Sequence, residues 1–202
     1  MIFQLVVLLM SAIIHEYMHG WAADQLGDDT AKRAGRLTLN PLAHIDLWGS
    51  VLMPALIYFA TSGGFIFGYA KPVPFNPYNL RDRKYGAAKV ALAGPLSNLF
   101  LALVFGLFIR FFGAGGGMIN QAALQFVQIV VYINLLLAVF NAIPIPPLDG
   151  SRIIMPFLPY AAQKFFAQLE SVGMFLVLAF VLFGFSIIVP IINFLFRLIT
   201  GV

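Results

Sequence analysis

The chain has 202 residues, of which 61% are hydrophobic and only 10% are charged, and its mean hydropathy is +0.92. A soluble domain carries roughly 25% charged residues, so this composition excludes one and predicts an all-α integral membrane protein with about four to five transmembrane helices. The chain has no cysteine and a net charge of +4 carried mainly by loops, so we expect neither disulfides nor thiolate metal sites nor a nucleic-acid partner.

The first hydrophobic stretch, residues 1–23, contains the sequence His-Glu-Tyr-Met-His at positions 15–19. Ionisable side chains are costly at membrane depth and are usually functional there. His15 and His19 are four residues apart and share one helix face, so both can reach a single metal ion. Glu16 can then take a proton from a water on that ion. No basic residue precedes the stretch and no small-residue cleavage site follows it, so we interpret it as a retained span.

The second hydrophobic stretch, residues 47–69, is the weakest candidate for a span. Pro54 interrupts it, and a Thr-Ser-Gly-Gly sequence at 61–64 ends its apolar run, which is typical of re-entrant elements. The basic loops 24–46 and 70–89 can share the cytoplasmic face only if this stretch enters and leaves by the same side. We therefore predict an amino terminus outside, four full spans and one re-entrant element.

Residues 67–77 are predicted to form a short extended segment, because prolines recur there at alternate positions and favour extended backbone. An extended edge of this kind can pair with another extended peptide. The candidate peptide-binding residues are Lys71, Pro72, Val73, Pro74, Phe75 and Asn76.

Three further hydrophobic stretches complete the chain, at residues 87–112, 121–143 and 171–196. The first of these carries Ala-Gly-Pro-Leu-Ser-Asn at 93–98, a group of small residues suited to close helix contact. Pro190 predicts a kink or a break in the last.

A catalytic zinc site usually takes three protein ligands and one water, so the histidine pair needs a third partner. Asp149 is the strongest candidate because it follows an apolar span directly, on backbone that three prolines unwind and that Gly150 allows to turn tightly. His44, the remaining histidine, is interpreted as a gating residue or as an alternative third ligand.

These motifs, in this order, resemble the site-2 protease family of intramembrane zinc metalloproteases. The likeness rests on the histidine pair, on the Ala-Gly-Pro-Leu-Ser-Asn sequence, and on the segment from Asn141 to Leu148-Asp149-Gly150. It is strongest to the compact bacterial branch that lacks a PDZ domain. The resemblance implies a single polytopic protease domain over residues 1–202, with core motifs in 1–150 and an additional span at 171–200.

The resemblance also implies the roles of individual residues. His15, His19 and Asp149 would hold one zinc ion per chain, Glu16 would be the catalytic glutamate, and Asn141 would help to position substrate or water.

The leading functional interpretation is therefore a zinc-dependent endopeptidase of the cell membrane. It would cut membrane-protein substrates in or near their transmembrane segments, with its active site towards the cytoplasmic side of the bilayer. One alternative is a divalent-metal transporter or channel that uses the same three side chains as a transit site, and another is an inactive membrane scaffold. A transporter would be expected to carry further ionisable residues along a pathway, and the hydrophobic stretches hold few beyond this cluster.

Overall fold

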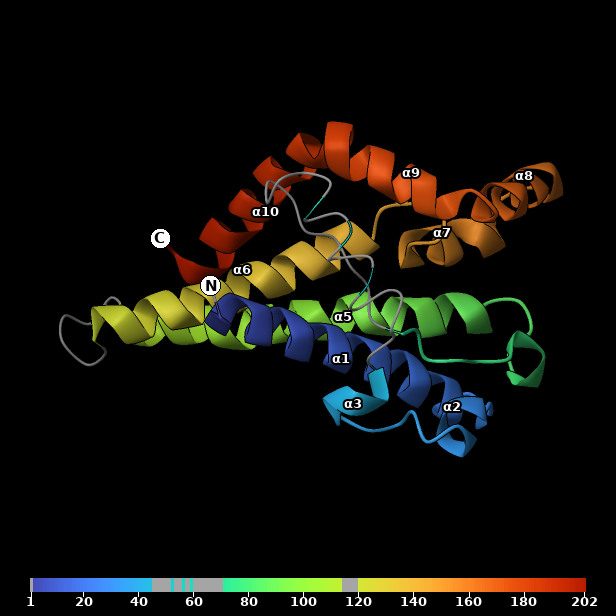
Figure 1. The fold of residues 1–202 in the computed structure, drawn as a ribbon, viewed down its shortest axis with the longest axis horizontal. Coiled ribbons are helices and arrows are strands. Elements are labelled where there is room, and N and C mark those ends of the chain that lie inside the picture. Colours follow the sequence, from blue (N-terminus) through green and yellow to red (C-terminus); the bar gives the residue numbers. More distant parts are fainter. Residues whose placement is uncertain (1, 45–51, 53–55, 57–58, 60–70, 114–119) are drawn as a thin grey trace.

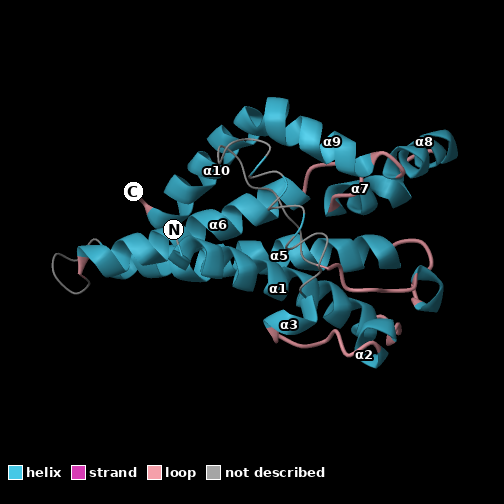
Figure 2. Cartoon of the chain, in the orientation of Figure 1, coloured by secondary structure: helices cyan, strands magenta, loops and turns pink. Residues whose placement is uncertain are grey.

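The computed structural model describes residues 2–44, 52, 56, 59, 71–113 and 120–202. Within these ranges the chain is helical and forms no strand, as Figure 2 shows. Four helices are long and apolar enough to cross a membrane, at Ile2–Gln25, Gly86–Gly113, Gln121–Asn141 and Gly173–Thr200. The prediction of an all-helical membrane protein is therefore confirmed. The predicted re-entrant element at 47–69 and the first four residues of the predicted extended segment lie outside the described residues, apart from three isolated positions.

The described elements follow one another in a simple order along the chain (Figure 1). The longer helices are α1 (Ile2–Gln25), α5 (Gly86–Phe108), α6 (Gln121–Asn141), α8 (Tyr160–Glu170) and α10 (Phe185–Thr200). The shorter ones are α2 (Thr30–Arg33), α3 (Pro41–His44), α7 (Asp149–Ile154), α9 (Gly173–Ala179), and 3-10 turns at Pro77–Asn79 and Met155–Phe157. π-helical turns follow α5 at Ile109–Gly113 and join α9 to α10 at Phe180–Gly184.

Three helices, α1, α5 and α6, pack against one another, and α5 runs antiparallel to the other two (Figure 1). The end of α1 and the start of α5 therefore lie at the same end of the bundle, where the Arg81 N–H donates to the Leu26 carbonyl at 2.9 Å. The largest apolar core lies between α5, α6 and α10, around Ala102, Leu135 and Ile192. Burial of these side chains holds α10 against the three-helix bundle.

The last span changes direction between α9 and α10, as Figure 1 shows. Pro190 lies inside α10, and the helix runs through it without a break. The departure from α-helical geometry lies earlier, at the π-helical turn Phe180–Gly184, because an inserted residue shifts the hydrogen-bond pattern there. The irregularity predicted at Pro190 is thus present in the span but at a different place.

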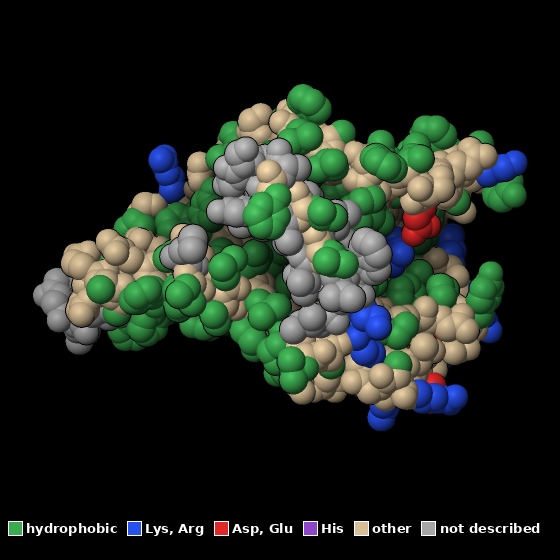
Figure 3. Space-filling model, viewed as in Figure 1, with side chains coloured by type: hydrophobic (Ala, Val, Ile, Leu, Met, Phe, Trp, Pro, Cys, Tyr) green, Lys and Arg blue, Asp and Glu red, His purple; other side chains and the backbone are tan. Residues whose placement is uncertain are grey.

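The outer surface of the bundle is largely apolar. Hydrophobic side chains are spread over the face seen in Figure 3, whereas most of the Lys and Arg side chains in view lie towards the end that carries α2 and α8. Phe59, Phe183 and Phe194 are among many large apolar side chains that are more than half exposed. Exposed apolar area on this scale is stable in contact with lipid and not in water.

Candidate metal centre

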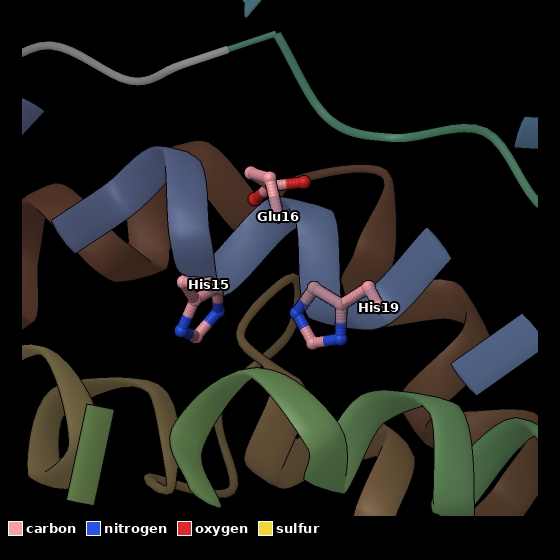
Figure 4. A group of neighbouring side chains, drawn as sticks. All are labelled: His15, Glu16 and His19. Atoms are coloured by element: carbon pink, nitrogen blue, oxygen red, sulfur yellow. The ribbon is translucent and has the colours of Figure 1, made fainter. Parts of the chain in front are cut away.

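Helix α1 presents His15 and His19 towards α5, as Figure 4 shows. Both side chains are buried, and their rings lie 4.6 Å apart, nearly at right angles. They can lie this close to α5 because the residue facing them is Gly94. A Cβ at Gly94 would stand 2.5 Å from Nε2 of His19 and 2.6 Å from Nε2 of His15. The small-residue patch predicted to allow helix contact therefore makes room for the two imidazoles.

Asp149, the first residue of α7, completes this cluster. Its Oδ2 lies 3.0 Å from Nε2 of His15 and 3.2 Å from Nε2 of His19. α7 can begin here because Gly150 packs against the end of α6. A Cβ at Gly150 would overlap the carbonyl oxygens of Ala142 and Ile143. The segment between α6 and α7 thus places the Asp149 carboxylate beside His15, although the two residues are 134 positions apart in the sequence.

The other nitrogen of each imidazole is fixed by an acceptor. Nδ1 of His15 lies 2.6 Å from Oδ1 of Asn98, and Nδ1 of His19 lies 2.8 Å from the carbonyl of Val90. A carbonyl oxygen only accepts, so both Nδ1 atoms carry hydrogen. In the neutral form of each ring the lone pair is then on Nε2, the nitrogen that faces Asp149.

Three acceptor atoms that converge in this way call for a cation. Ligands of a tetrahedral zinc ion with bonds of about 2.0–2.1 Å stand about 3.3 Å apart, close to the separations between the carboxylate and each Nε2. Two imidazole nitrogens and one carboxylate oxygen at these separations fit zinc.

Glu16 lies on a different side of α1 from the ring nitrogens (Figure 4). Its Oε2 accepts the backbone N–H of Val73 at 2.9 Å. Ligand atoms of His15, Glu16 and His19 do lie within 4.8 Å of one another, so Glu16 could also be considered a ligand. Asp149 fits that place better because its Oδ2 already lies 3.0 Å and 3.2 Å from the two Nε2 atoms.

Residues 71–76 run alongside α1 on the side of Glu16 without forming a helix. The N–H of Lys71 donates to the His44 carbonyl at 2.9 Å, and the N–H of Asn76 donates to Oδ2 of Asp28 at 2.6 Å. The Val73 side chain is buried against Gly20, where an added Cβ would stand 2.8 Å from its Cγ1. Most backbone donors of this segment are therefore engaged, since Pro72 and Pro74 have none.

Two predicted site residues lie apart from the three-residue cluster. His44 is buried, and its Nε2 donates to the Thr38 carbonyl at 2.8 Å. Asn141 ends α6 and donates from Nδ2 to the Leu137 carbonyl, one turn back in the same helix, at 3.0 Å. Within the described chain, neither side chain hydrogen-bonds to His15, His19 or Asp149.

Sequence reasoning missed Asn98 and Asp28. The sequence indicates Asn98 only as part of the small-residue group at 93–98, whereas Oδ1 of Asn98 contacts Nδ1 of His15 directly. Its position four residues after Gly94 puts it on the α5 face that meets the histidines, and this spacing was the available signal. Asp28 gave no such signal, because its partners Asn76 and Asn79 lie about 50 residues away in sequence.

Comparisons with known proteins agree on one family. A model of Peptidase family M50 matches residues 109–184. A protein named "Putative zinc metalloprotease YwhC" from Bacillus subtilis is 38% identical over 195 residues, which cover 93% of this chain and 84% of YwhC. Rip2 of Mycolicibacterium smegmatis, named in the same way, is 33% identical over 84% of this chain and 62% of its own length. No solved structure matches the chain significantly.

Proposed function

The chain belongs to peptidase family M50, and from that membership we propose that it is a zinc-dependent intramembrane endopeptidase acting in or near transmembrane segments of other membrane proteins. The observation that carries the proposal is the convergence of two oriented imidazoles and one carboxylate in a multi-pass membrane protein. The names of the relatives describe zinc metalloproteases. Neither these names nor the site favours the metal transporter or channel considered from the sequence.

One zinc ion per chain would be held by Nε2 of His15, Nε2 of His19 and a carboxylate oxygen of Asp149. When bound, zinc lowers the pKa of water towards about 7 and polarises the scissile carbonyl. Three protein ligands leave a further coordination position open, as catalytic sites require. The buried acceptors at Nδ1 of each histidine support this assignment because they keep both Nε2 lone pairs available.

Glu16 acts as the general base in this proposal. It takes a proton from the attacking water and passes it to the amine that leaves. In the resting geometry Oε2 of Glu16 accepts the Val73 N–H, and we expect that oxygen to exchange partners when a substrate carbonyl binds. Asn141 would donate to the developing oxyanion after its amide leaves the Leu137 carbonyl.

The substrate would bind as a locally unwound stretch along residues 71–76. Free carbonyls of a substrate need donors, and the Val73 N–H, which donates to Oε2 of Glu16 at 2.9 Å, is one. A substrate carbonyl that accepts this N–H would displace Glu16 and release the base at the place where the peptide bond arrives. His44, whose carbonyl accepts the Lys71 N–H, would help to hold the start of the segment and so influence access.

The protein would lie in the cell membrane, with its amino terminus outside and its site near the cytoplasmic face. Basic side chains gathered towards one end of the bundle support this orientation. The chain has no cysteine, so single cysteines can report it without background. We expect Arg83→Cys to react with a membrane-impermeant thiol reagent in inverted vesicles and Ile2→Cys to react in intact cells, and the reverse pattern would refute the orientation.

The chemistry is tested by zinc content and cleavage in detergent-purified protein with a model transmembrane substrate. Wild type should hold about one zinc per chain, and Asp149→Ala should lose it. Glu16→Gln should keep zinc and lose cleavage by about 100-fold or more, as expected when a general base is removed. A wild-type protein that binds zinc but cleaves no substrate would favour the inactive scaffold, and zinc flux into liposomes would favour the transporter.

The substrate path is tested by replacing Pro72 and Pro74 together with alanine, which favours helix over extended backbone. Cleavage should fall while zinc content stays unchanged. Full cleavage by this double variant would overturn the pairing proposal and leave the zinc chemistry untouched.

A further inference from the structure

A chain of buried amides lies behind His15, at the seam where α1, α5 and α6 meet. Asn98 of α5 and Asn134 of α6 are buried almost completely, as is Ser11 of α1. Nδ2 of Asn98 donates to the Ser11 carbonyl at 3.2 Å and to Oδ1 of Asn134 at 3.0 Å. Nδ2 of Asn134 donates to the Val130 carbonyl at 2.9 Å and to Oγ of Ser11 at 3.0 Å. One polar network thus joins the three core helices.

The direction of every hydrogen bond in this network follows from two backbone carbonyls. A carbonyl oxygen only accepts, so the amide of Asn134 must turn its nitrogen to Val130 and its oxygen to Asn98. The amide of Asn98 must likewise turn its nitrogen to Ser11, which leaves its oxygen for His15. That oxygen, 2.6 Å from Nδ1, requires a hydrogen on Nδ1 of His15.

We propose that Asn98 is a positioning residue for His15 and that the Ser11 carbonyl and Asn134 together fix the orientation of Asn98. The inference rests on the proposed zinc site. The contact with Asn98 keeps His15 in the tautomer whose Nε2 lone pair faces Asp149, and this tautomer is the one that binds a metal. A reversed Asn98 amide would present N–H to Nδ1, move the ring hydrogen to Nε2, and turn a donor towards the metal position.

The test compares two substitutions of Asn98. Asn98→Asp keeps an oxygen for Nδ1 of His15 but loses both donor contacts, whereas Asn98→Leu loses the oxygen and the donors together. Zinc affinity is measured by competition with a chromophoric chelator, and thermal stability is measured on the same samples. We expect Asn98→Leu to weaken zinc binding about 10- to 100-fold, the usual effect of removing such a partner, and Asn98→Asp to retain binding within a few-fold although it loses stability.

Two further variants serve as controls for this interpretation. Asn134→Leu should weaken zinc binding less than Asn98→Leu, because the Ser11 carbonyl still holds the Asn98 nitrogen. Ser97→Ala, which removes a neighbouring α5 hydroxyl bonded to the Gly94 carbonyl at 2.7 Å, should leave zinc affinity unchanged.

A loss of zinc affinity in Asn98→Asp equal to that in Asn98→Leu would overturn the positioning role, because the lost donors alone would then explain both. Wild-type affinity in Asn98→Leu would also overturn it. A wild-type protein that binds no zinc would instead refute the proposed function, so the two failures are distinguishable.

Discussion

The two sides of α1 around residues 15–19 are built in different ways. On the side facing α5, the histidines are buried, and each Nδ1 has a fixed acceptor within the helix bundle. On the side facing residues 71–76, Glu16 is held by one backbone N–H from a proline-rich segment. The first side is suited to hold an ion permanently, and the second is suited to exchange one hydrogen bond for another. The chemistry of a hydrolase needs both properties within one turn of helix.

The strongest way to break this contrast is to disturb the inner side through Gly94→Ala. The new Cβ would stand 2.5 Å from Nε2 of His19 and 2.6 Å from Nε2 of His15, so both rings must leave their positions. We expect zinc affinity to fall by at least about 10-fold, as it does when ligand orientation is lost. The matched control is Gly106→Ala in the same helix, where the Cβ meets Ile199 and not a histidine. This control should lower stability and spare zinc, and equal zinc loss in both variants would contradict the assignment.

The outer side is tested next by Gly20→Ala. Its Cβ would stand 2.8 Å from Cγ1 of Val73, so we expect Val73 to shift away from α1 and its N–H to leave the place beside Glu16 where a substrate carbonyl would bind. Cleavage should fall by up to about 100-fold, because reacting groups lose their alignment, while zinc content stays the same. Loss of zinc in this variant would show that the two sides of α1 are not independent.

Asp28 accepts the N–H of Asn76, so the pH dependence of stability tests how residues 71–76 are held. Burial by itself would raise the pKa of its carboxyl, but hydrogen bonds from Thr30, Asn76 and Asn79 outweigh burial and lower that pKa. A carboxyl with a lowered folded-state pKa stabilises the fold above its unfolded pKa of about 3.9, and this stabilisation is lost as pH falls through the folded-state value. Asp28→Asn should therefore be less stable than wild type at neutral pH, and its melting temperature should depend less on pH below about 4. Parallel pH curves for the two proteins would refute this role.

The smallest effect is expected at Arg152, which lies in the same helix as Asp149 and close to Phe75 of the segment 71–76. It follows Asp149 in α7, pairs with Glu170 at 3.2 Å, and lies 5.9 Å from the Phe75 ring centre. Both contacts are largely exposed, and each contributes about 1 kcal/mol or less. Arg152→Ala should leave zinc content unchanged and reduce cleavage by no more than about fivefold. A larger loss, measured as kcat/KM, would mean that α7 and residues 71–76 are coupled through this side chain.

The spans were predictable because their signal is local. Each long apolar run, such as 121–143, exceeds what a soluble helix carries, and the structure forms a helix within two residues of that range. The turn at Phe180–Gly184 was not predictable, because no proline or glycine pair marks its start. Pro190 attracted the prediction because it is the local signal for a bend.

The site was predictable only as far as residue chemistry reaches. The spacing of His15 and His19 fixes their common face on α1, and the motif at Asp149 indicated a partner, which the structure brings within 3.2 Å. The acceptors at Asn98 and Val90 and the donor at Val73 could not be read from sequence, because they depend on how helices far apart in the chain are rotated against one another. The roles of His15, His19 and Asp149 as metal ligands remain predictions that zinc-binding measurements will test.

The hydrogen bond between Val73 and Glu16 has a consequence for selectivity. An intact helix already uses its carbonyls internally, so it has none to offer the Val73 N–H. On the proposed exchange, the enzyme would discriminate among membrane proteins by how readily a segment frays, and the identity of the side chains would matter less. Glycine or proline near the scissile bond would then raise the rate even where no pocket recognises them, and a uniformly stable helix would pass through the site uncut.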